Sequence, residues 1–190
     1  MHPDVRDLVN AVWIVVGIYW GVDALREKPA VKRQSFASRA FHIAMAFAAW
    51  LLIWDKAPAI GFLGRRFVSS AAWIQWLGLL ITISGCTFAV WARVCLGSNW
   101  SGTVTIKQNH ELIRRGPYAV VRHPIYSGLL LALTGTVIVA GEIRALCGLG
   151  LAFVIFFLKS GLEERFMREQ FPAEYASYAQ RVRRLIPLIL

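Results

Sequence analysis

The stretch IYSGLLLALTGTVIVAGEIRALCGLGLAFVIFFL, residues 125–158, is mostly apolar over its whole length. Gly141 and Glu142 divide it into two runs, residues 125–140 and 143–158. Each run is near the lower end of the length that an α-helix needs to cross a bilayer. A two-residue gap suits a tight turn between antiparallel helices. The stretch therefore predicts a hairpin of two membrane-crossing helices.

Three more apolar runs precede this hairpin, at residues 8–25, 40–63 and 71–96. Charged residues and a proline interrupt the second run after Trp54, so its spanning part is expected to stop near that residue. Five such runs in 190 residues favour a membrane protein over a buried soluble bundle. The predicted fold class is an all-α integral membrane protein with five transmembrane helices, built as one membrane domain over residues 1–190.

The basic residues lie between the apolar runs, and the formal net charge is +10. With the amino terminus outside, sixteen Lys and Arg residues fall on the cytoplasmic side. Five fall outside, namely Arg6, Lys56, Arg65, Arg66 and Arg144. This asymmetry predicts an outside amino terminus and a cytoplasmic carboxyl terminus. An anionic lipid surface explains the charge better than nucleic acid does, so no nucleic-acid partner is expected.

Several common site types have no signature in the chain. Cys86, Cys95 and Cys147 form no CxxC pair, which argues against a disulfide framework and a thiolate metal site. His110 and His123 have no carboxylate or cysteine at ligand spacing, so no metal is expected. No cleavable signal peptide is evident, because acidic rather than basic residues precede the first apolar run. P-loop, G-x-S-x-G, H-E-x-x-H and G-x-G-x-x-G motifs are absent.

Two polar stretches remain, and both are predicted to be cytoplasmic. Residues 97–124 form a long loop with apolar residues spaced through it, so we expect it to be ordered. Residues 161–184 look like a helix interrupted at Pro172. Its aromatic residues form one stripe, which consists of Phe166, Phe171, Tyr175 and Tyr178.

The segment GPYAVVRHPIYSG, residues 116–128, is the densest polar cluster beside an apolar run. Pro124 is expected in the first turn of the following helix, where its missing N–H costs nothing. Arg122 and His123 would then lie at the helix mouth, where free backbone N–H groups favour an anion such as a ligand carboxylate. The alternative is a headgroup anchor, with Tyr118 and Tyr126 in the aromatic belt.

A second cluster, Lys159, Glu163 and Glu164, follows the last apolar run. Lys159 and Glu163 are four residues apart and share a helix face, whereas Glu163 and Glu164 point about 100° apart. Charges at the end of an apolar helix are functional candidates. The alternative is an ordinary Lys–Glu pair that marks where the helix leaves the bilayer.

These motifs together resemble a known family. The chain resembles the isoprenylcysteine carboxyl methyltransferase family in two segments, GPYAVVRHPIYSG (residues 116–128) and EERFMREQFPAEYASYAQRVRRLIP (residues 163–187). This family belongs to a wider group with the phospholipid methyltransferases. LGSNWSGTV, residues 96–104, and NHELIRRG, residues 109–116, also match bacterial members. The resemblance covers about residues 91–187, or half of the chain.

The resemblance implies S-adenosyl-L-methionine as the cofactor, held on the cytoplasmic side by residues 93–190, with residues 1–92 supplying the first three transmembrane helices. Glu163 would hold the ammonium or ribose, His123 the carboxylate, and Tyr118 with aliphatic neighbours the adenine. Carried over by motif, the cofactor contacts are His110, Leu112, Ile113, Tyr118, His123, Pro124, Ile125, Tyr126 and Glu163.

The resemblance also implies a reaction, which is methyl transfer to a lipophilic acceptor reached from the bilayer, with the bacterial inner membrane as the expected location. Lys159 stands where eukaryotic members carry an Arg that is thought to orient the substrate carboxylate, so it is the catalytic candidate. Lysine keeps the charge but loses the bidentate fork. The alternatives are a phospholipid amine or small thiol as acceptor, a membrane reductase with a nicotinamide cofactor, and a non-catalytic scaffold.

Overall fold

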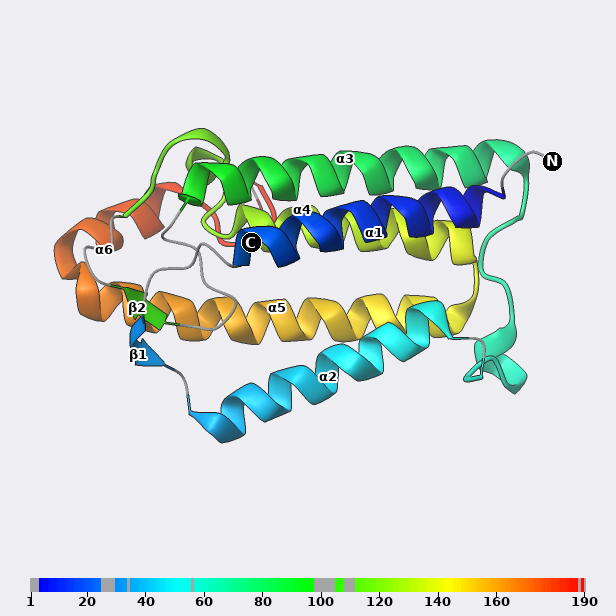
Figure 1. Ribbon diagram of the computed structural model, residues 1–190, viewed down its shortest axis with the longest axis horizontal. Coiled ribbons are helices and arrows are strands. Elements are labelled where there is room, and N and C mark those ends of the chain that lie inside the picture. The colour runs from blue at the N-terminus through cyan, green and yellow to red at the C-terminus, as the bar shows by residue number, and fades with distance from the viewer. Residues whose placement is uncertain are drawn as a thin grey trace.

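The computed structural model describes residues 4–24, 30–33, 35–55, 57–97, 105–107, 112–187 and 189. Long helices dominate this part of the chain, and they lie roughly side by side along the longest axis (Figure 1). The α-helices are α1 (Val5–Ala24), α2 (Phe36–Trp54), α3 (Ala72–Leu96), α4 (Pro124–Ala140), α5 (Ile143–Gln170) and α6 (Pro172–Arg181). Two 3-10 helices are η1 (Gly61–Gly64) and η3 (Gly116–Ala119).

Four of these helices, α1, α2, α3 and α5, are long and apolar enough to cross a membrane. Helix α4 has 17 residues and is apolar, which is at the short limit of a spanning helix. Large apolar side chains stay exposed along the helices, including Ile18, Phe47, Trp76 and Leu131. Lipid accommodates such surfaces and water does not. The chain is therefore an integral membrane protein, as predicted, and a fifth crossing by α4 remains a prediction.

The predicted ends of the apolar helices agree with the structure at two informative places. Helix α2 ends at Trp54, and the N–H of its cap Asp55 donates to Leu51 O at 3.0 Å. Helices α4 and α5 form the predicted hairpin across Gly141 and Glu142. Gly141 adopts a left-handed conformation with φ of 72°, which glycine reaches without a steric penalty. Two residues are thus enough to reverse the chain.

Helix α5 is longer than predicted. The fifth apolar run was expected to end at residue 158, before a separate polar helix, but α5 continues without a break to Gln170. Lys, Glu, Arg and Met dominate the extension, and all are strong helix formers. At 28 residues the helix is about 42 Å long, so it reaches beyond a hydrocarbon core of about 30 Å. Pro172 then begins α6, at the interruption that was predicted.

A short two-stranded ribbon was not predicted. Strand β1 (Ala30–Arg33) pairs antiparallel with β2 (Thr105–Lys107), and Lys32 lies opposite Ile106. The ribbon lies near the end of the molecule that carries α6 (Figure 1). The all-α prediction therefore describes the membrane part, and only parts of the loop 97–124 are among the described residues.

Helices α3 and α4 pack through glycines. A Cβ on Gly85 would lie 2.3 Å from Ala132 N, and a Cβ on Gly135 would lie 2.3 Å from Gly78 O. A Cβ on Gly128 would lie 2.7 Å from Ala89 N of α3. Any side chain would push the two backbones apart. Small residues permit this approach between membrane helices, where van der Waals contact drives association.

Helix α1 lies against this glycine seam and is attached to it by polar contacts. Trp13 Nε1 donates to Thr136 Oγ1 of α4 at 2.9 Å, and Thr136 Oγ1 in turn lies 3.5 Å from Thr82 Oγ1 of α3. Near its carboxyl end, the Asp23 carboxylate pairs with the buried Arg93 guanidinium of α3. Paired groups of this kind avoid the cost of unsatisfied polar atoms in hydrocarbon.

Helix α2 packs instead against α5. Ala49 and Ile53 are buried together with Ala145 and Ile155 in one apolar cluster. The buried Arg144 guanidinium donates to Leu52 O at 2.8 Å and to Ile53 O at 3.1 Å, which satisfies carbonyls at the end of α2. Figure 1 shows α1 beside α3 and α4, and α2 beside α5. Helix α4 joins these two parts of the bundle, because its Leu133 and Val137 belong to the same apolar cluster.

Candidate functional site

The predicted site residues lie where the amino end of α4 meets the charged end of α5. His123 is the N-cap of α4, and Pro124 is fully buried at its first position. The backbone N–H groups of Arg122 and His123 donate to the carbonyls of Arg183 and Arg184, at 2.7 and 3.0 Å. These two amides therefore hold the carboxyl-terminal segment. An anion at the remaining free N–H groups of the first turn of α4 stays a prediction.

Glu164 is the buried centre of the charged cluster, with 4% of its surface exposed. Arg122 Nε and Nη2 lie 2.9 and 2.8 Å from Glu164 Oε1. Arg168 donates to the other carboxylate oxygen at 3.2 Å, and Arg184 Nε is 3.7 Å from Oε1. A buried carboxylate with several cationic partners is compensated for its lost hydration. Glu164 thus joins α4, α5 and the carboxyl-terminal segment.

The ring of His123 lies between the two neighbouring glutamates. Its Nδ1 is 3.3 Å from Glu163 Oε2, and its Nε2 is 3.3 Å from Glu164 Oε1. Burial alone would lower the pKa of His123, but hydrogen bonds to both carboxylates outweigh it and raise the pKa above its ordinary value. Both ring nitrogens face protein carboxylates, so neither points to the ligand carboxylate that the resemblance assigned to His123.

Glu163 has a different environment from Glu164. The Tyr126 hydroxyl donates to its Oε1, and its Oε2 faces His123. Its side chain is 28% exposed, against 5% for Glu164. A carboxylate has about four acceptor positions, so Glu163 keeps capacity for further donors. Of the two carboxylates, Glu163 is therefore the one that a ligand could reach.

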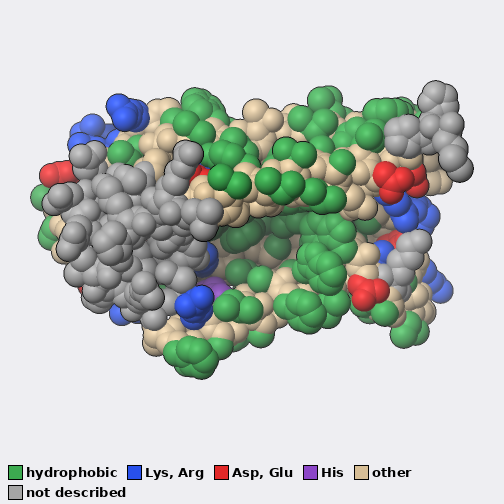
Figure 2. Space-filling model, in the orientation of Figure 1, with side chains coloured by type: hydrophobic (Ala, Val, Ile, Leu, Met, Phe, Trp, Pro, Cys, Tyr) green, Lys and Arg blue, Asp and Glu red, His purple; other side chains and the backbone are tan. Residues whose placement is uncertain are grey.

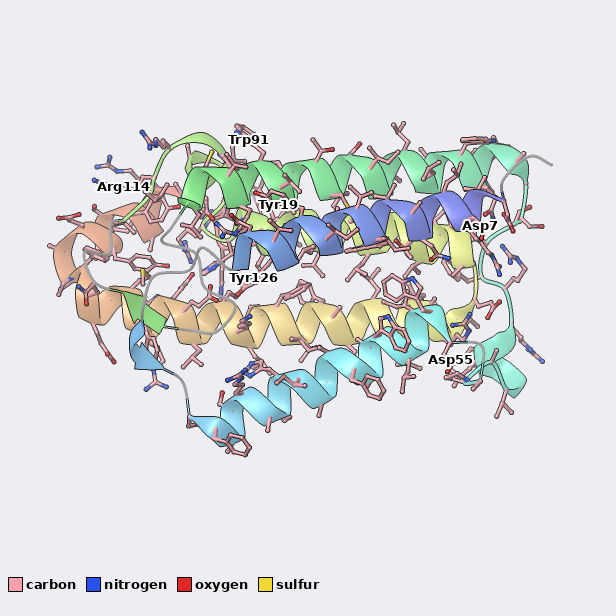
Figure 3. All side chains as sticks on the ribbon, viewed as in Figure 1. Asp7, Tyr19, Asp55, Trp91, Arg114 and Tyr126 are labelled. Carbon is pink, nitrogen blue, oxygen red and sulfur yellow. The ribbon has the colours of Figure 1, made fainter. Side chains whose placement is uncertain are left out.

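Tyr126 connects Glu163 to Lys159. Its ring stacks between His123 and Phe156, with centroids at 5.8 and 5.0 Å. Lys159 Nζ lies 5.6 Å from the centroid of the same ring. Figure 3 shows Tyr126 in the space between the α1 and α5 ribbons, toward the opposite end of the bundle from Asp7 and Asp55. The structure thus brings the two sequence clusters, 116–128 and 159–164, into one place.

An apolar cluster adjoins this polar group. Tyr118 and Ile125 are buried with Ala92 of α3, and Ile113 and Tyr126 pack against them. The Tyr178 hydroxyl of α6 donates to Tyr118 O at 2.6 Å, which attaches α6 to the loop. Burial raises the pKa of the Tyr118 phenol, which stays neutral.

Most of the predicted contacts therefore fall in one region of the structure. The residues brought together are Ile113, Tyr118, His123, Pro124, Ile125, Tyr126, Lys159 and Glu163. Leu112 is half-buried next to Ile113. His110 lies outside the described residues.

The sequence names Arg122 and Glu164 within the two polar clusters but does not predict that they pair, and it gives no role to Arg184. Burial of an Arg–Glu pair 42 residues apart leaves no local pattern in a sequence. The signal that could have been used is the adjacency of the two glutamates, since one of them must face the interior.

The face between α1 and α5 is hollowed. Figure 2 shows a recess there, with hydrophobic side chains on its walls. Helix α1 packs on α3 and α4, and α5 packs on α2, so neither helix covers the other. The polar group around Tyr126 lies in this space, and an apolar molecule could pack against the hydrophobic walls next to it.

A sequence profile of the family described as phospholipid methyltransferase matches residues 73–174. The chain is 30% identical over 120 residues to protein-S-isoprenylcysteine O-methyltransferase B of Arabidopsis thaliana, across 62% of this chain and 61% of that protein. It is 30% identical over 116 residues to the cobalt-zinc-cadmium resistance protein CzcN of Cupriavidus metallidurans, across 60% of this chain and 51% of that protein.

Among solved structures, the fold is similar to that of the eukaryotic intramembrane Ras methyltransferase ICMT (isoprenylcysteine carboxyl methyltransferase). The TM-score is 0.61 at 23% sequence identity, over 84% of this chain and 55% of that chain. The chain thus spans between half and two thirds of the length of these relatives, and the matched part includes the polar cluster described above.

Proposed function

Because the chain belongs to the phospholipid methyltransferase family, we propose that it transfers a methyl group from S-adenosyl-L-methionine to a lipophilic acceptor that it reaches from the bilayer. The observation that carries this proposal is the partly exposed Glu163, Tyr126 and Lys159 group beside an apolar recess. Relatives named protein-S-isoprenylcysteine O-methyltransferase support an acceptor with a prenyl chain and a carboxylate.

The donor set fits S-adenosyl-L-methionine, which has an amino-acid end, a sulfonium and an adenine. Glu163 would accept from the ammonium or the ribose hydroxyls, since its carboxylate is partly exposed and has acceptor positions left. Tyr118 and Ile113 would line the adenine, because they form the apolar cluster next to Tyr126. When bound, this cofactor supplies a methyl group activated by its sulfonium.

The residues around Glu163 position it and do no chemistry themselves. Arg122 holds Glu164, Glu164 and Glu163 hold the His123 ring, and Tyr126 donates to Glu163. Contacts of this kind, made by residues behind the ligand-binding carboxylate, keep that carboxylate in one orientation. Catalysis is then mostly proximity and alignment, and a carboxylate or thiolate acceptor needs little general-base help. His123 is accordingly a positioning residue in this proposal.

The charge of Lys159 discriminates between the candidate acceptors. Its ammonium lies over the Tyr126 ring, at the end of the recess where the acceptor's reactive group would sit. A cation there attracts a carboxylate or thiolate and repels a phospholipid ammonium. This charge favours an anionic lipophilic acceptor over a phospholipid amine. The apolar walls of the recess in turn favour a lipophilic molecule over a small polar thiol.

We also propose that the site faces the cytoplasm and that the protein belongs in a bacterial inner membrane. The basic residues of the sequence concentrate on the site side, which supports a cytoplasmic carboxyl terminus. A reporter active only in the cytoplasm, fused after residue 190, should be active. A silent reporter on a stably expressed fusion would refute the orientation.

The central experiment measures binding and transfer separately. Calorimetry on detergent-purified protein should show binding of S-adenosyl-L-methionine or its demethylated product, weakened in Glu163→Ala. Glu174→Ala on the exposed face of α6 is the matched control and should bind normally. Labelled S-adenosyl-L-methionine with a lipid extract should then yield a labelled lipophilic product. Binding of NADPH instead would support the reductase alternative, and binding of neither would support a scaffold.

A further inference from the structure

The recess has a wall at one end that the proposed reaction does not explain. Trp13 of α1 and Trp54 of α2 meet edge to face, with centroids 5.7 Å apart and planes at 82°. Their helices belong to the two different parts of the bundle, so this contact bridges them. Figure 2 shows hydrophobic side chains between the two sides of the recess, away from the end that carries α6.

The tryptophan pair is held in place. Trp13 Nε1 donates to Thr136 Oγ1 at 2.9 Å, and Thr136 Oγ1 donates to Ala132 O at 3.0 Å. Both indoles also pack against the buried cluster that contains Ile53 and Val137. A large side chain with a hydrogen bond and a packed face has one stable orientation. The pair therefore forms a fixed barrier and not a loose cover.

The rise of α4 gives the distance along the helix between the tryptophan pair and the polar group around Tyr126. Tyr126 and Thr136 both lie on α4, ten residues apart, which corresponds to about 15 Å of helix. Carbon–carbon single bonds are about 1.5 Å long, so an extended chain advances about 1.3 Å per bond. Tyr126 and Thr136 are thus separated along the helix by about the length of twelve such bonds in line, which matches the main chain of a farnesyl group. A geranylgeranyl group is one isoprene unit longer.

We propose that Trp13 and Trp54 are specificity-determining residues that limit the length of the acceptor's apolar tail to about that of a farnesyl chain. The inference rests on the proposed function, because the tail belongs to the acceptor whose anionic group meets Lys159. Beyond the proposed function, the tryptophan pair sets the maximum length of the acceptor's tail. A chain that is too long meets the indoles and pulls its reactive group away from Tyr126.

Methyl transfer to two matched probes tests the barrier. Wild-type protein in lipid nanodiscs should methylate N-acetyl-S-farnesylcysteine with kcat/KM at least about tenfold above that for N-acetyl-S-geranylgeranylcysteine, since one methylene can produce that discrimination in an apolar pocket. Trp54→Leu should bring the ratio close to one by admitting the longer chain. Trp76→Leu on the exposed face of α3 is the control and should keep the wild-type ratio. A ratio unchanged in Trp54→Leu would overturn the proposal.

A second measurement does not depend on methyl transfer or on the leucine variant. N-acetylcysteine thioethers with a terminal bromine on a dodecyl or a hexyl chain should quench tryptophan fluorescence by contact. The dodecyl probe should quench wild type more strongly than the conservative double variant Trp13→Phe/Trp54→Phe, and the hexyl probe should quench both equally. Equal dodecyl quenching in both proteins would overturn the length limit. Specific quenching without methyl transfer to any probe would instead overturn the proposed function alone.

Discussion

The interface between α3 and α4 and the space between α1 and α5 show opposite solutions to helix packing in a bilayer. Glycines bring the α3 and α4 backbones into contact, so that an added Cβ at Gly85 or Gly135 has no room. Helix α1 packs mainly on α3 and α4, whereas α5 packs mainly on α2 and α4, and Figure 2 shows a recess between α1 and α5. One interface fixes the scaffold, and the other leaves room for a molecule from the lipid phase.

The same contrast recurs within the site, at two adjacent residues. Glu164 faces the closed side, where three arginines and His123 surround it. Glu163 faces the open side, with Tyr126 and His123 as its partners and part of its surface exposed. The comparison teaches that one glutamate holds the fold together while its neighbour remains available. Each prediction below tests one side against the other.

The glycine seam should be the most sensitive feature. Gly85→Leu should destabilise the protein by more than about 3 kcal/mol, the upper range for overpacked interiors, because its Cβ alone would meet the α4 backbone. Gly150→Leu on α5 is the matched control, since a Cβ there meets nothing within 4 Å. Thermal unfolding in detergent measures both. A seam variant as stable as its control would show that the two helices can separate without cost.

The two glutamates should separate stability from binding. Glu164→Gln should lower the free energy of unfolding by about 3–5 kcal/mol, because it leaves the mostly buried Arg122 guanidinium without its anion. Glu163→Gln should change stability by less than about 1 kcal/mol, as expected for a partly exposed group, yet weaken S-adenosyl-L-methionine binding. Chemical unfolding and calorimetry on the same preparations give both quantities. Equal stability losses would refute the division of roles.

Lys159 tests whether the open side receives an anionic acceptor. Lys159→Met should reduce methyl transfer tenfold or more, which corresponds to about 1.4 kcal/mol of transition-state stabilisation, while cofactor affinity barely changes. Lys159→Arg should preserve or improve activity on a carboxylate acceptor through its bidentate fork. Arg165→Met, an exposed cation on the same helix, is the control. Full activity in Lys159→Met would mean that the lysine only reaches for the headgroups.

The smallest expected effect is the pH dependence of the stability that His123 contributes through its contacts with Glu163 and Glu164. The pKa of His123 is raised in the folded protein, against an ordinary value of 6.5, so its contribution to stability is fully present below that pH. The contribution is lost as the pH rises through the folded-state pKa. The stability difference between wild type and His123→Gln should therefore shrink above pH 6.5. A constant difference would show that the ring acts by packing alone.

The membrane helices could be predicted from the sequence because a bilayer imposes a local rule. Each span must be a run of apolar residues of sufficient length, so the runs near α1, α2 and α3 and the Gly141–Glu142 turn follow directly. The candidate site was proposed in the same way, since RHP-x-Y and the EE pair are local motifs. The continuation of α5 to Gln170 was not predicted, because the change from apolar to polar residues shows where a helix can leave the hydrocarbon core and does not show where the helix ends.

The sequence by itself determined the class of protein and the hairpin and singled out the candidate site residues, because those features depend on composition and on neighbours along the chain. Only the tertiary structure decided which glutamate is buried, that His123 joins both of them, and that Trp13 meets Trp54. These contacts join residues about 40 apart in sequence, and side-chain direction on a helix selects among them. That direction depends on how the helices pack, which in this protein depends on four glycines between α3 and α4.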